Sequence, residues 1–284
     1  MTLDELEHLF DLSNPEALER WDQIVRATGM YTVALFAQSN SEAGDVLRLA
    51  GTGTLVAVGE EHYILTAHHV WDRVLRGANN VGISLREGDD HRYFISIKTI
   101  VPFSPSKPNE WNEWGPDVVF LRIPPAHVGD IKAFRVFYRL PEPENPTVLV
   151  DAIETRLLMG TPHDLGTFTQ THASVQILGL TVGQPTCHER GGLDYVDVEA
   201  RPAAQFRVTS FGGFSGGGLW VVDIFANPKT GKIDSVAKLE GMAFWEFNVA
   251  NGQGTIRCHG RNYIEAAMAV ITPYNAASSA DESQ

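Results

Sequence analysis

The chain has 284 residues, of which 43% are hydrophobic and 20% charged, a composition close to that of an average globular protein. Its 22 basic residues against 35 acidic ones give a formal net charge of −13, which argues against a broad nucleic-acid surface because such surfaces need clustered Lys and Arg. No run approaches the roughly eighteen apolar residues of a membrane span, and the acidic start Met1–Glu5 does not resemble a signal peptide. Two cysteines are too few for a disulfide framework. We therefore expect a cytoplasmic protein that binds neither membrane nor nucleic acid.

Residues 1–30 are predicted to form an acidic helical extension. Apolar residues recur at helical spacing over 3–10 and again over 18–25. Between them, Ser13 and Glu16 have the spacing of a capping box, and Asn14 before Pro15 is an equally good cap. Seven acids stand against two arginines in this segment. The segment is either a helix packed on the body with a solvated acidic face, which we favour, or a docking element for a regulatory protein partner.

From residue 31 the pattern changes to short apolar runs broken by turn residues, which is typical of β-strands. A polar, proline-rich stretch at 102–116 and a partly helical connection at 126–138 interrupt these runs, and 227–231 predicts a hairpin turn. An apolar helix at 263–271 follows. The predicted strands are Tyr31–Ala37, Val46–Leu49, Thr52–Val58, His62–Ala67, Val81–Leu85, Tyr93–Ile97, Asp117–Ile123, Arg156–Met159, Ala173–Leu180, Leu193–Glu199, Gln205–Thr209, Leu219–Phe225 and Ser235–Asn248. Two batches of short strands with few helices predict an antiparallel all-β fold in two halves.

Two segments of the first half carry residues suited to catalysis, and each also has an ordinary structural explanation. His69 follows a buried strand where the chain turns into a short helix at 69–75, so its ring can be held rigidly while it stays exposed; a histidine beside an apolar strand is more often structural. Asp117 opens an apolar strand and needs donors, since an unpaired buried carboxylate is costly. A turn after Gly115-Pro116 would also satisfy this aspartate.

The third segment is a glycine-rich stretch around Ser215. Five glycines between Phe211 and Leu219 release the backbone from steric limits, which allows the N–H groups of Gly213 and Ser215 to point at one spot, as an oxyanion hole requires. The alternative is a flexible turn, although the apolar strand that follows argues against a linker.

The order His, Asp, Ser along the chain is one of the few used by serine nucleophile triads, and the surrounding segments match a family. Thr66-Ala67-His68-His69 resembles the T-A-x-H segment of the trypsin-like (chymotrypsin-fold) serine peptidases. Asp117–Leu121 resembles their D-[IV]-A-L-L strand, and Gly213–Gly217 resembles their G-[DN]-S-G-G. Two further segments resemble the strand of the substrate cleft (G-I-x-S-W) and the opening of the second barrel (G-x-P): Gly241–Trp245 and Leu158–Pro162.

The resemblance runs from Thr32 to Cys258, leaves the N-terminal helices unaccounted for, and implies a fold of two antiparallel six-stranded β-barrels. The first barrel would occupy 31–128 with His69 and Asp117, and the second 129–260 with Ser215. A C-terminal helix at 261–275 and a flexible tail at 276–284 would follow.

Carried over position by position, the resemblance implies a triad. Ser215 would be the nucleophile, His69 the general base and then acid, and Asp117 the group that holds the imidazole in its tautomer. The N–H groups of Gly213 and Ser215 would bind the oxyanion. Motif spacing favours His69 over His68, and Ser210, the rival nucleophile, lacks flanking glycines.

Four positions match the family's substrate pocket: Thr209 at its floor, and Phe244, Trp245 and Glu246 on its wall. Thr209 is neutral, whereas Glu246 could bind a basic substrate side chain or narrow the entrance of the pocket. We expect a slight preference for small or uncharged P1 residues over basic ones.

Two departures from the family concern activation and the support of Asp117. Phe214 stands where secreted, zymogen-activated members carry an aspartate, and the I-V-G-G activation sequence is absent, so the resemblance is closer to bacterial members made in active form or gated by other means. Phe244 replaces a serine and removes one polar support near Asp117.

The pairs Cys187-His188 and Cys258-His259 do not predict a metal site, because adjacent strand residues point to opposite faces and zinc ligands are usually spaced further apart. We expect free buried thiols and no cofactor.

The leading hypothesis is an intracellular serine endopeptidase that hydrolyses peptide bonds of a protein or peptide substrate through an acyl-enzyme. The alternative is a catalytically silent trypsin-fold module that binds a partner through its acidic helices. An esterase of another fold would need a helix after the serine, where 218–222 predicts a strand.

Overall fold

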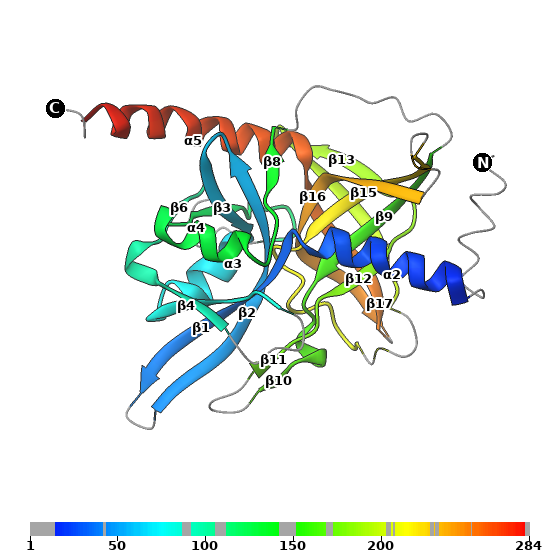
Figure 1. The fold of residues 1–284 in the computed structure, drawn as a ribbon, viewed down its shortest axis with the longest axis horizontal. Helices are drawn as coiled ribbons and strands as arrows, with labels where there is room; N and C mark the ends of the chain where they lie inside the picture. The colour runs from blue at the N-terminus through cyan, green and yellow to red at the C-terminus, as the bar shows by residue number, and fades with distance from the viewer. Residues whose placement is uncertain are drawn as a thin grey trace.

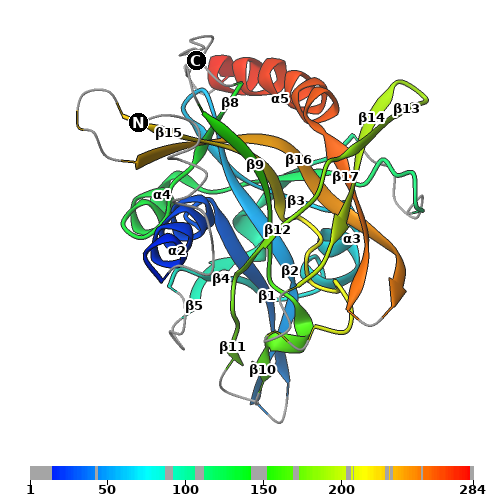
Figure 2. The same ribbon diagram turned by 90° about the vertical axis from the view of Figure 1, so that its right-hand side faces the viewer.

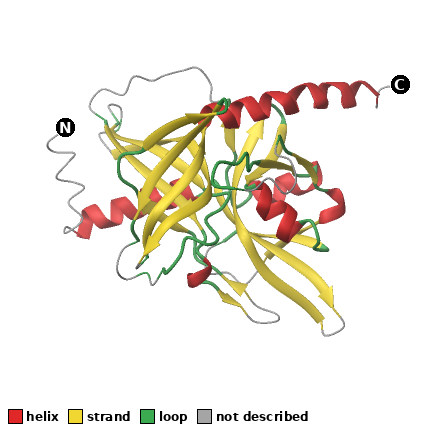
Figure 3. Ribbon diagram, turned by 180° about the vertical axis from the view of Figure 1, so that it is seen from behind, coloured by secondary structure: helices red, strands yellow, loops and turns green. Residues whose placement is uncertain are grey.

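Two β-sheets make up most of the fold, which is described here from a computed structural model (Figure 1). The described residues are 15–41, 44–86, 92–105, 112–141, 152–168, 173–202, 206, 208–227, 230, 233–250 and 252–281, with the backbone alone for 272–281. The predicted helix at 3–10 and the caps at Ser13 and Asn14 lie outside them. Seen from behind, the strands fall into two groups that lie side by side (Figure 3).

The first sheet contains strands from the N-terminal half of the chain. Its strands are β1 (Thr32–Ser41), β2 (Gly44–Val58), β3 (Glu61–Thr66), β4 (Asn80–Ser84), β5 (Arg92–Ser96), β6 (Val101–Phe103), β7 (Val119–Arg122) and β8 (Tyr138–Leu140). They are hydrogen-bonded in the order β5-β4-β1-β2-β3-β7-β6, and β8 pairs with β2. All of these pairs are antiparallel except β2–β8, which is parallel.

The second sheet contains the later strands in the order β12-β9-β15-β16-β17-β14-β13. They are β9 (Ile153–Gly160), β12 (Leu178–Thr181), β13 (Thr186–Arg190), β14 (Leu193–Ala200), β15 (Gly218–Ala226), β16 (Ile233–Ala250) and β17 (Gln253–Gly260). All the pairs are antiparallel, and an isolated antiparallel bridge joins Val182, just beyond β12, to Ala200 at the end of β14. The hairpin of β13 and β14 projects from the body (Figure 2), and β10 (Thr167–Phe168) pairs only with β11 (Ala173–Ser174).

The prediction of a mostly-β fold in two halves is confirmed, but the predicted six strands in each half are not found. The first sheet has eight strands and the second has seven. β8 belongs to the first sheet although it lies beyond the predicted boundary at 128. The strand predicted at 205–209 is wrong, since its described residues are irregular, and the one predicted at 173–180 is broken into β11 and β12.

The sequence analysis did not predict β13 and β17, because strands were recognised by their apolar residues and these two strands contain several polar and charged residues. β13 is mostly exposed, so it lacks any apolar alternation. β17 buries Arg257 and His259, and their partners come from distant parts of the chain. Alternation of apolar residues reveals a strand only when its buried residues are apolar, so this pattern could not indicate either strand.

The helices pack against strands of both sheets: α2 (Pro15–Gly29) contacts β1 and β9, α4 (Pro125–Lys132) contacts β3, and α5 (Arg261–Asp281) contacts β14, β16 and β17. α3 (His68–Val70) runs directly into the π-helix η1 (Trp71–Leu75), and single 3-10 turns occur at η2 (Ile97–Thr99) and η3 (His163–Leu165). The short helix predicted at 69–75 is thus confirmed. α5 (Arg261–Asp281) continues six residues past the predicted end at 275, so 276–281 is helical rather than a frayed tail. No helix within the described ranges is long and apolar enough to cross a membrane.

One apolar core joins the two sheets. Leu55, Ile64 and Phe120 of the first sheet belong to the same buried cluster as Trp220 and Phe244 of the second. At the junction Tyr31 stacks on Trp220 with ring centroids 4.9 Å apart. Because burying such large rings removes extensive apolar surface from water, this shared core holds the two halves in a fixed relation.

α2 packs one face against the body and leaves its charged face in solvent. Ala17 and Ile24 are buried against the body, where α2 contacts β1 and β9. The exposed face carries i,i+4 pairs such as Glu16–Arg20, whose atoms are 2.6 Å apart. The packed arrangement favoured by the sequence is therefore the one that α2 adopts.

Arg135 fastens the end of α2 to the first half of the fold. Its side chain is only 6% exposed, and its guanidinium donates from Nη1 to Gly29 O at 3.1 Å and from Nη2 to Ser84 O at 3.3 Å. The end of a helix leaves carbonyl groups without partners and carries partial negative charge, so a cation there stabilises it.

Replacing Arg135 with methionine is expected to lower the free energy of unfolding by about 2–4 kcal/mol, because two buried carbonyls lose charged donors. Urea unfolding measures the change. Arg26 on the same helix is the matched control, since its side chain is 75% exposed and its bridge to Asp22 spans 3.5 Å. Arg26→Met is expected to cost less than about 0.5 kcal/mol, and equal losses in the two variants would contradict the prediction.

Candidate active site

His69 and Asp117 are brought together by the pairing of β3 with β7. Thr66 at the end of β3 lies opposite Val119 at the start of β7, so the residues just beyond the two strand ends are neighbours. Asp117 is 1% exposed and accepts two hydrogen bonds from His69: Oδ1 from the backbone N–H at 2.8 Å, and Oδ2 from Nδ1 at 2.6 Å. A carboxylate that holds Nδ1–H leaves Nε2 as the unprotonated nitrogen of the neutral ring.

His68, the neighbour of His69, lies elsewhere. It is 6% exposed and does not line the pocket into which His69 opens. Burial lowers the pKa of His68 below its ordinary value, with the charge of Asp117 opposing this shift. The side chain in contact with Asp117 is therefore that of His69.

Ser215 lies in a loop whose carbonyl groups accept hydrogen bonds from threonines of the first sheet. Thr52 on β2 donates its N–H to Ser215 O at 3.0 Å and its hydroxyl to Gly213 O at 2.6 Å. Thr54, two residues along the same strand, donates to Gly216 O at 3.0 Å. Because these bonds cross from one half of the fold to the other, the position of the serine depends on how the halves pack.

The glycines of this loop are required by its shape. Gly213 and Gly216 have φ values of 98° and 93°, which favour glycine. A Cβ at 213 would also run into Thr161 O, and one at 216 into Thr52 O. Phe214 between them is 1% exposed and packs edge-on against Phe211, with ring centroids 5.8 Å apart.

The backbone N–H groups of this loop are almost all used. Phe211 donates to Glu246 Oε2, Gly212 to Ser210 Oγ, Phe214 to Phe211 O, Gly216 to Ala243 O and Gly217 to Phe214 O. Between Phe211 and Gly217, a segment that the structure describes completely, the N–H groups of Gly213 and Ser215 are the two that make no hydrogen bond. An oxyanion-binding site needs unpaired N–H donors near the nucleophile, and here one donor is the N–H of Ser215 itself and the other lies two residues before it.

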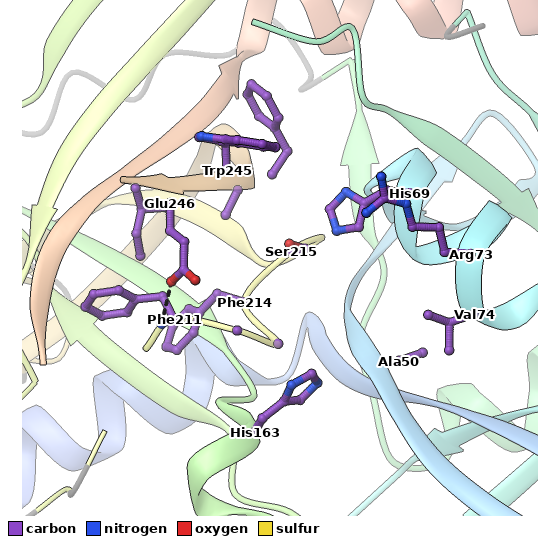
Figure 4. A pocket seen from close by; sticks show the side chains of 15 residues that line it. Ala50, His69, Arg73, Val74, His163, Phe211, Phe214, Ser215, Trp245 and Glu246 are labelled. Carbon is purple, nitrogen blue, oxygen red and sulfur yellow. Dashed lines mark hydrogen bonds between the residues drawn. The ribbon is translucent and has the colours of Figure 1, made fainter. Parts of the chain in front are cut away.

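A pocket of about 540 Å³ opens between the two halves, and both His69 and Ser215 line it. Figure 4 shows Ser215 between the His69 ring and the aromatic wall that includes Phe214 and Trp245. Within the described structure no hydrogen bond joins Ser215 Oγ to His69 Nε2; such bonds often form fully only when substrate is present. Ala50 also lines the pocket, and it is the extra residue of a bulge in the β1–β2 ladder.

The structure brings three of the four predicted pocket residues to this cavity. Phe244, Trp245 and Glu246 line it, with Trp245 37% exposed. Thr209, predicted at the pocket floor, does not line it; its N–H and hydroxyl bind Asp164 Oδ2 at 2.6 and 2.7 Å. These donors lower the pKa of Asp164. Thr209 lies outside any strand and is exposed, so it faces Asp164 rather than the pocket.

Several residues that line the pocket were not predicted from the sequence, among them Arg73, His163 and Phe211. Arg73 follows His69 by four residues on the same helical segment, so helical spacing could have indicated it. His163 lies beside the serine loop, where its N–H donates to Gly212 O at 2.8 Å, and partial burial lowers the pKa of its ring. Phe211 precedes the glycine loop. Ser210, the rival nucleophile, does not line the pocket.

A buried histidine behind Asp117 was not predicted. His259 on β17 is fully buried, and its Nε2 accepts the N–H of Asp117 at 3.0 Å. Burial lowers the pKa of His259 to about 3, although the charge of Asp117 opposes the shift. Besides Asp117, the polar side chains that face it are those of Tyr195 and Tyr263. The ring is therefore neutral and an acceptor.

The lowered pKa of His259 predicts an acid-sensitive contribution to stability. The unfolded chain takes up a proton on this ring as the pH falls below the ordinary value of 6.5, whereas the folded protein does so only near 3. Stability from this group is thus lost as the pH falls through that window. In thermal unfolding at about pH 7 and about pH 4.5, the advantage of the wild type over His259→Gln should shrink at the lower pH. A gap that stays constant or widens would contradict this expectation.

Both cysteines are free thiols. Cys258 is buried, and burial raises the pKa of its thiol, but Cys187 is exposed, so the prediction of two buried thiols is half wrong. His188 binds Asp197 Oδ2 at 3.1 Å. Within the described part of the chain no group of three or more His, Cys, Asp or Glu side chains is arranged to hold a metal ion.

The chain matches no protein-family model and no curated protein. Among solved structures it is similar to an inactive form of a serine-to-alanine mutant of Rv3671c from M. tuberculosis H37Rv, with 16% identity over 88% of this chain and 90% of that chain and a TM-score of 0.43. It is also similar to a structure described as showing coupled folding and binding of the Sesbania mosaic virus VPg protein, with 14% identity over 83% and 88% of the two chains and a TM-score of 0.40. Neither likeness bears on activity.

The two-sheet, mostly-β architecture is itself consistent with a chymotrypsin-like fold. The chemistry that this chain can perform is inferred from the residues of the pocket that His69 and Ser215 line.

Proposed function

We propose that this protein is a serine endopeptidase whose catalytic residues are His69, Asp117 and Ser215. The observation that carries the proposal is the arrangement around one pocket: a histidine held at Nδ1 by a buried aspartate, a serine lining the same cavity, and two unpaired N–H groups beside that serine. Each feature has a structural explanation alone, but acyl transfer requires all three together.

The mechanism follows from the hydrogen bonds. Because Asp117 accepts Nδ1–H, Nε2 of His69 is free to take the proton of Ser215 as its Oγ attacks the substrate carbonyl carbon. The negative charge that develops on the carbonyl oxygen is stabilised by the N–H groups of Gly213 and Ser215. His69 then passes its proton to the leaving amine as the peptide C–N bond breaks. His69 then takes a proton from a water molecule as the water oxygen attacks the acyl carbon, and passes that proton to Ser215 Oγ as the ester C–O bond breaks.

A serine-reactive fluorophosphonate probe tests the proposal directly. An activated Ser215 Oγ displaces fluoride from phosphorus, and mass spectrometry locates the new O–P bond. We expect the wild type and Ser210→Ala to be labelled and Ser215→Ala to remain unlabelled. Absence of Ser215-dependent labelling, under conditions in which trypsin is labelled, would overturn the proposal in favour of a silent binding module.

Glu246 supports a proposal about the substrate. With Thr209 outside the pocket, Glu246 is the acidic side chain among the residues that line it. Its Oε2 accepts the Phe211 N–H at 2.6 Å, which holds the carboxylate against the pocket wall (Figure 4). A fixed negative charge in a partly desolvated cavity favours a basic side chain and repels an acidic one. This reverses the slight preference for uncharged P1 residues, which rested on Thr209.

Replacing Glu246 with glutamine removes the charge and keeps an oxygen that can accept the Phe211 N–H. We expect the ratio of kcat/KM for P1-Lys over P1-Ala peptides to fall about tenfold, since one lost charge interaction of about 1.4 kcal/mol has that effect. Parallel assays of matched peptides measure the ratio. An unchanged ratio in an active variant would remove Glu246 as a determinant of specificity.

The cytoplasmic location and the regulatory partner at residues 1–30 also remain proposals. An unrestrained intracellular endopeptidase would damage its host, which is the reason to expect a partner there. Deletion of residues 1–14, which leaves α2 in place, followed by the labelling assay tests whether that segment restrains Ser215.

A further inference from the structure

We propose that His259, on β17 of the second sheet, is a positioning residue that holds Asp117 in place for its contact with His69; the inference rests on the proposed function. The two residues are 142 positions apart in the chain, and the contact is a hydrogen bond of 3.0 Å from Asp117 N to His259 Nε2. His259 touches neither the substrate pocket nor Ser215 directly, so it would act through Asp117.

The bonding of Asp117 shows why its backbone matters. Both carboxylate oxygens accept from His69, and no other described residue donates to them. Bonds to His69 alone would allow the aspartate and the histidine to move together. Within the described ranges, one hydrogen bond ties Asp117 to the second sheet, and it is the bond that the Asp117 N–H donates to His259.

The His259 ring is itself held by packing. Phe244 stacks on it with centroids 4.0 Å apart and planes 13° from parallel, and Tyr195 and Tyr263 lie at 5.5 and 4.9 Å. Phe244 is the extra residue of a bulge in the β16–β17 ladder. His259 Nδ1 is buried and makes no hydrogen bond among the described residues. The ring therefore keeps its orientation through aromatic contacts, at the cost of one unpaired donor.

Gly115 allows the loop before Asp117 to reach this ring. A Cβ at 115 would lie 2.8 Å from Cε1 and 2.9 Å from Nε2 of His259, closer than any real contact. The residue also has a φ of 58°, where a side chain is strained. Glycine thus meets two requirements at once, a tight turn and a close approach to His259.

Two further residues of the second sheet seat the same loop. Tyr195 on β14 donates its hydroxyl to Trp114 O. Arg257 on β17 donates to Glu113 O at 3.0 Å and lies over the Trp114 ring at 3.7 Å. Asp197 holds that guanidinium with two bonds of 2.7 Å. The segment 113–117 is therefore bound to the second sheet along its length, while the strand it leads into belongs to the first.

This arrangement makes the distance between Asp117 and His69 depend on the packing of the two halves. His69 is carried by the first sheet through α3, whereas Asp117 lies between the start of β7 in the first sheet and His259 in the second, so its backbone is held by both sheets. A misplacement of about 1 Å at a catalytic group can cost about 100-fold in rate. Loss of the His259 acceptor leaves the Asp117 N–H buried and unpaired, which favours such a displacement.

Two substitutions at position 259 separate positioning from bulk stability. His259→Leu fills the space without an acceptor, whereas Gln in His259→Gln can still accept the Asp117 N–H through Oε1. We expect His259→Leu to lower kcat for a peptide substrate about 10- to 100-fold with KM little changed, and His259→Gln to recover most of that loss. The acidic limb of the kcat/KM profile should move to lower pH in His259→Leu, because a displaced Asp117 stabilises the protonated His69 less well.

A spectroscopic readout keeps the inference independent of activity. The proton NMR signal of the His69 Nδ1–H bond to Asp117 should be downfield in the wild type and in His259→Gln, and weakened or lost in His259→Leu. If His259→Leu does not fold, Tyr195→Phe, which removes the donor to Trp114 O, should shift the same signal and the same acidic limb to a smaller extent.

An unchanged signal and unchanged pH profile in a folded His259→Leu or Tyr195→Phe would overturn the inference. Equal kinetic losses in His259→Leu and His259→Gln would also overturn it, since they would indicate a purely structural role. If the wild type shows no Ser215-dependent labelling, the proposed function fails, and the NMR signal still decides whether His259 positions Asp117.

Discussion

The Ser215→Ala variant is expected to cleave peptides with a kcat about 10⁶-fold below that of the wild type, the size of loss seen when a triad nucleophile is removed. In the proposed mechanism the hydroxyl oxygen of Ser215 forms the bond with the substrate, and among the described residues no other serine lines the pocket. Substrate binding should be retained, because the pocket walls and the unpaired N–H groups of Gly213 and Ser215 remain. Single-turnover kinetics and an independent binding measurement separate the two effects.

Ser210→Ala is the matched control for this experiment. It removes a hydroxyl five positions away that accepts a 3.3 Å bond from Gly212 N and does not line the pocket. Its kcat should stay within a few-fold of the wild type. A Ser215→Ala protein that still turned over substrate, or a Ser210→Ala protein that did not, would contradict the assignment of the nucleophile.

The Asp117→Asn variant is expected to lose about 10⁴-fold in kcat while it stays folded. The carboxylate accepts both N–H and Nδ1–H of His69, at 2.8 and 2.6 Å. An asparagine has one acceptor oxygen and one NH₂ donor, so if the oxygen keeps the backbone bond, the amide faces the ring and donates to Nδ1. The proton of the neutral ring then sits on Nε2, which can no longer take the proton of Ser215.

Asp223→Asn provides the control for a lost carboxylate at the surface. Asp223 binds Lys238 at 2.9 Å on the β15–β16 hairpin, away from the pocket, and its replacement should leave kcat unchanged. Circular dichroism and the urea midpoint establish that Asp117→Asn is folded. A folded Asp117→Asn enzyme within tenfold of the wild type would show that Asp117 does not orient His69.

Much of the candidate site could be predicted because its residues belong to short local patterns. His69 follows an apolar strand that runs into a helix, Asp117 opens a second apolar strand, and the glycines around Ser215 mark a strained loop. In each case the neighbouring residues determine the local backbone. The pairing of β3 with β7 then places the first two together, as the order of the motifs indicated.

Other predictions failed where neighbours along the chain carry no information. Thr209 was placed in the pocket by its distance from Ser215, but an irregular segment turns it toward Asp164. β17 was missed because its buried residues include an arginine and a histidine with distant partners. The end of α5 was set at 275 because small and polar residues follow, although the helix continues to Asp281.

The sequence by itself indicated the two halves of the fold, the chain order of His69, Asp117 and Ser215, and the glycine-rich loop around the serine. Only the tertiary structure decided how those groups are held. Whether Thr52 meets Gly213, whether Glu246 reaches Phe211, and whether His259 lies behind Asp117 depend on which sheet faces come together. That choice is made by burial of a core shared between the halves, a property of the whole chain that no local spacing encodes.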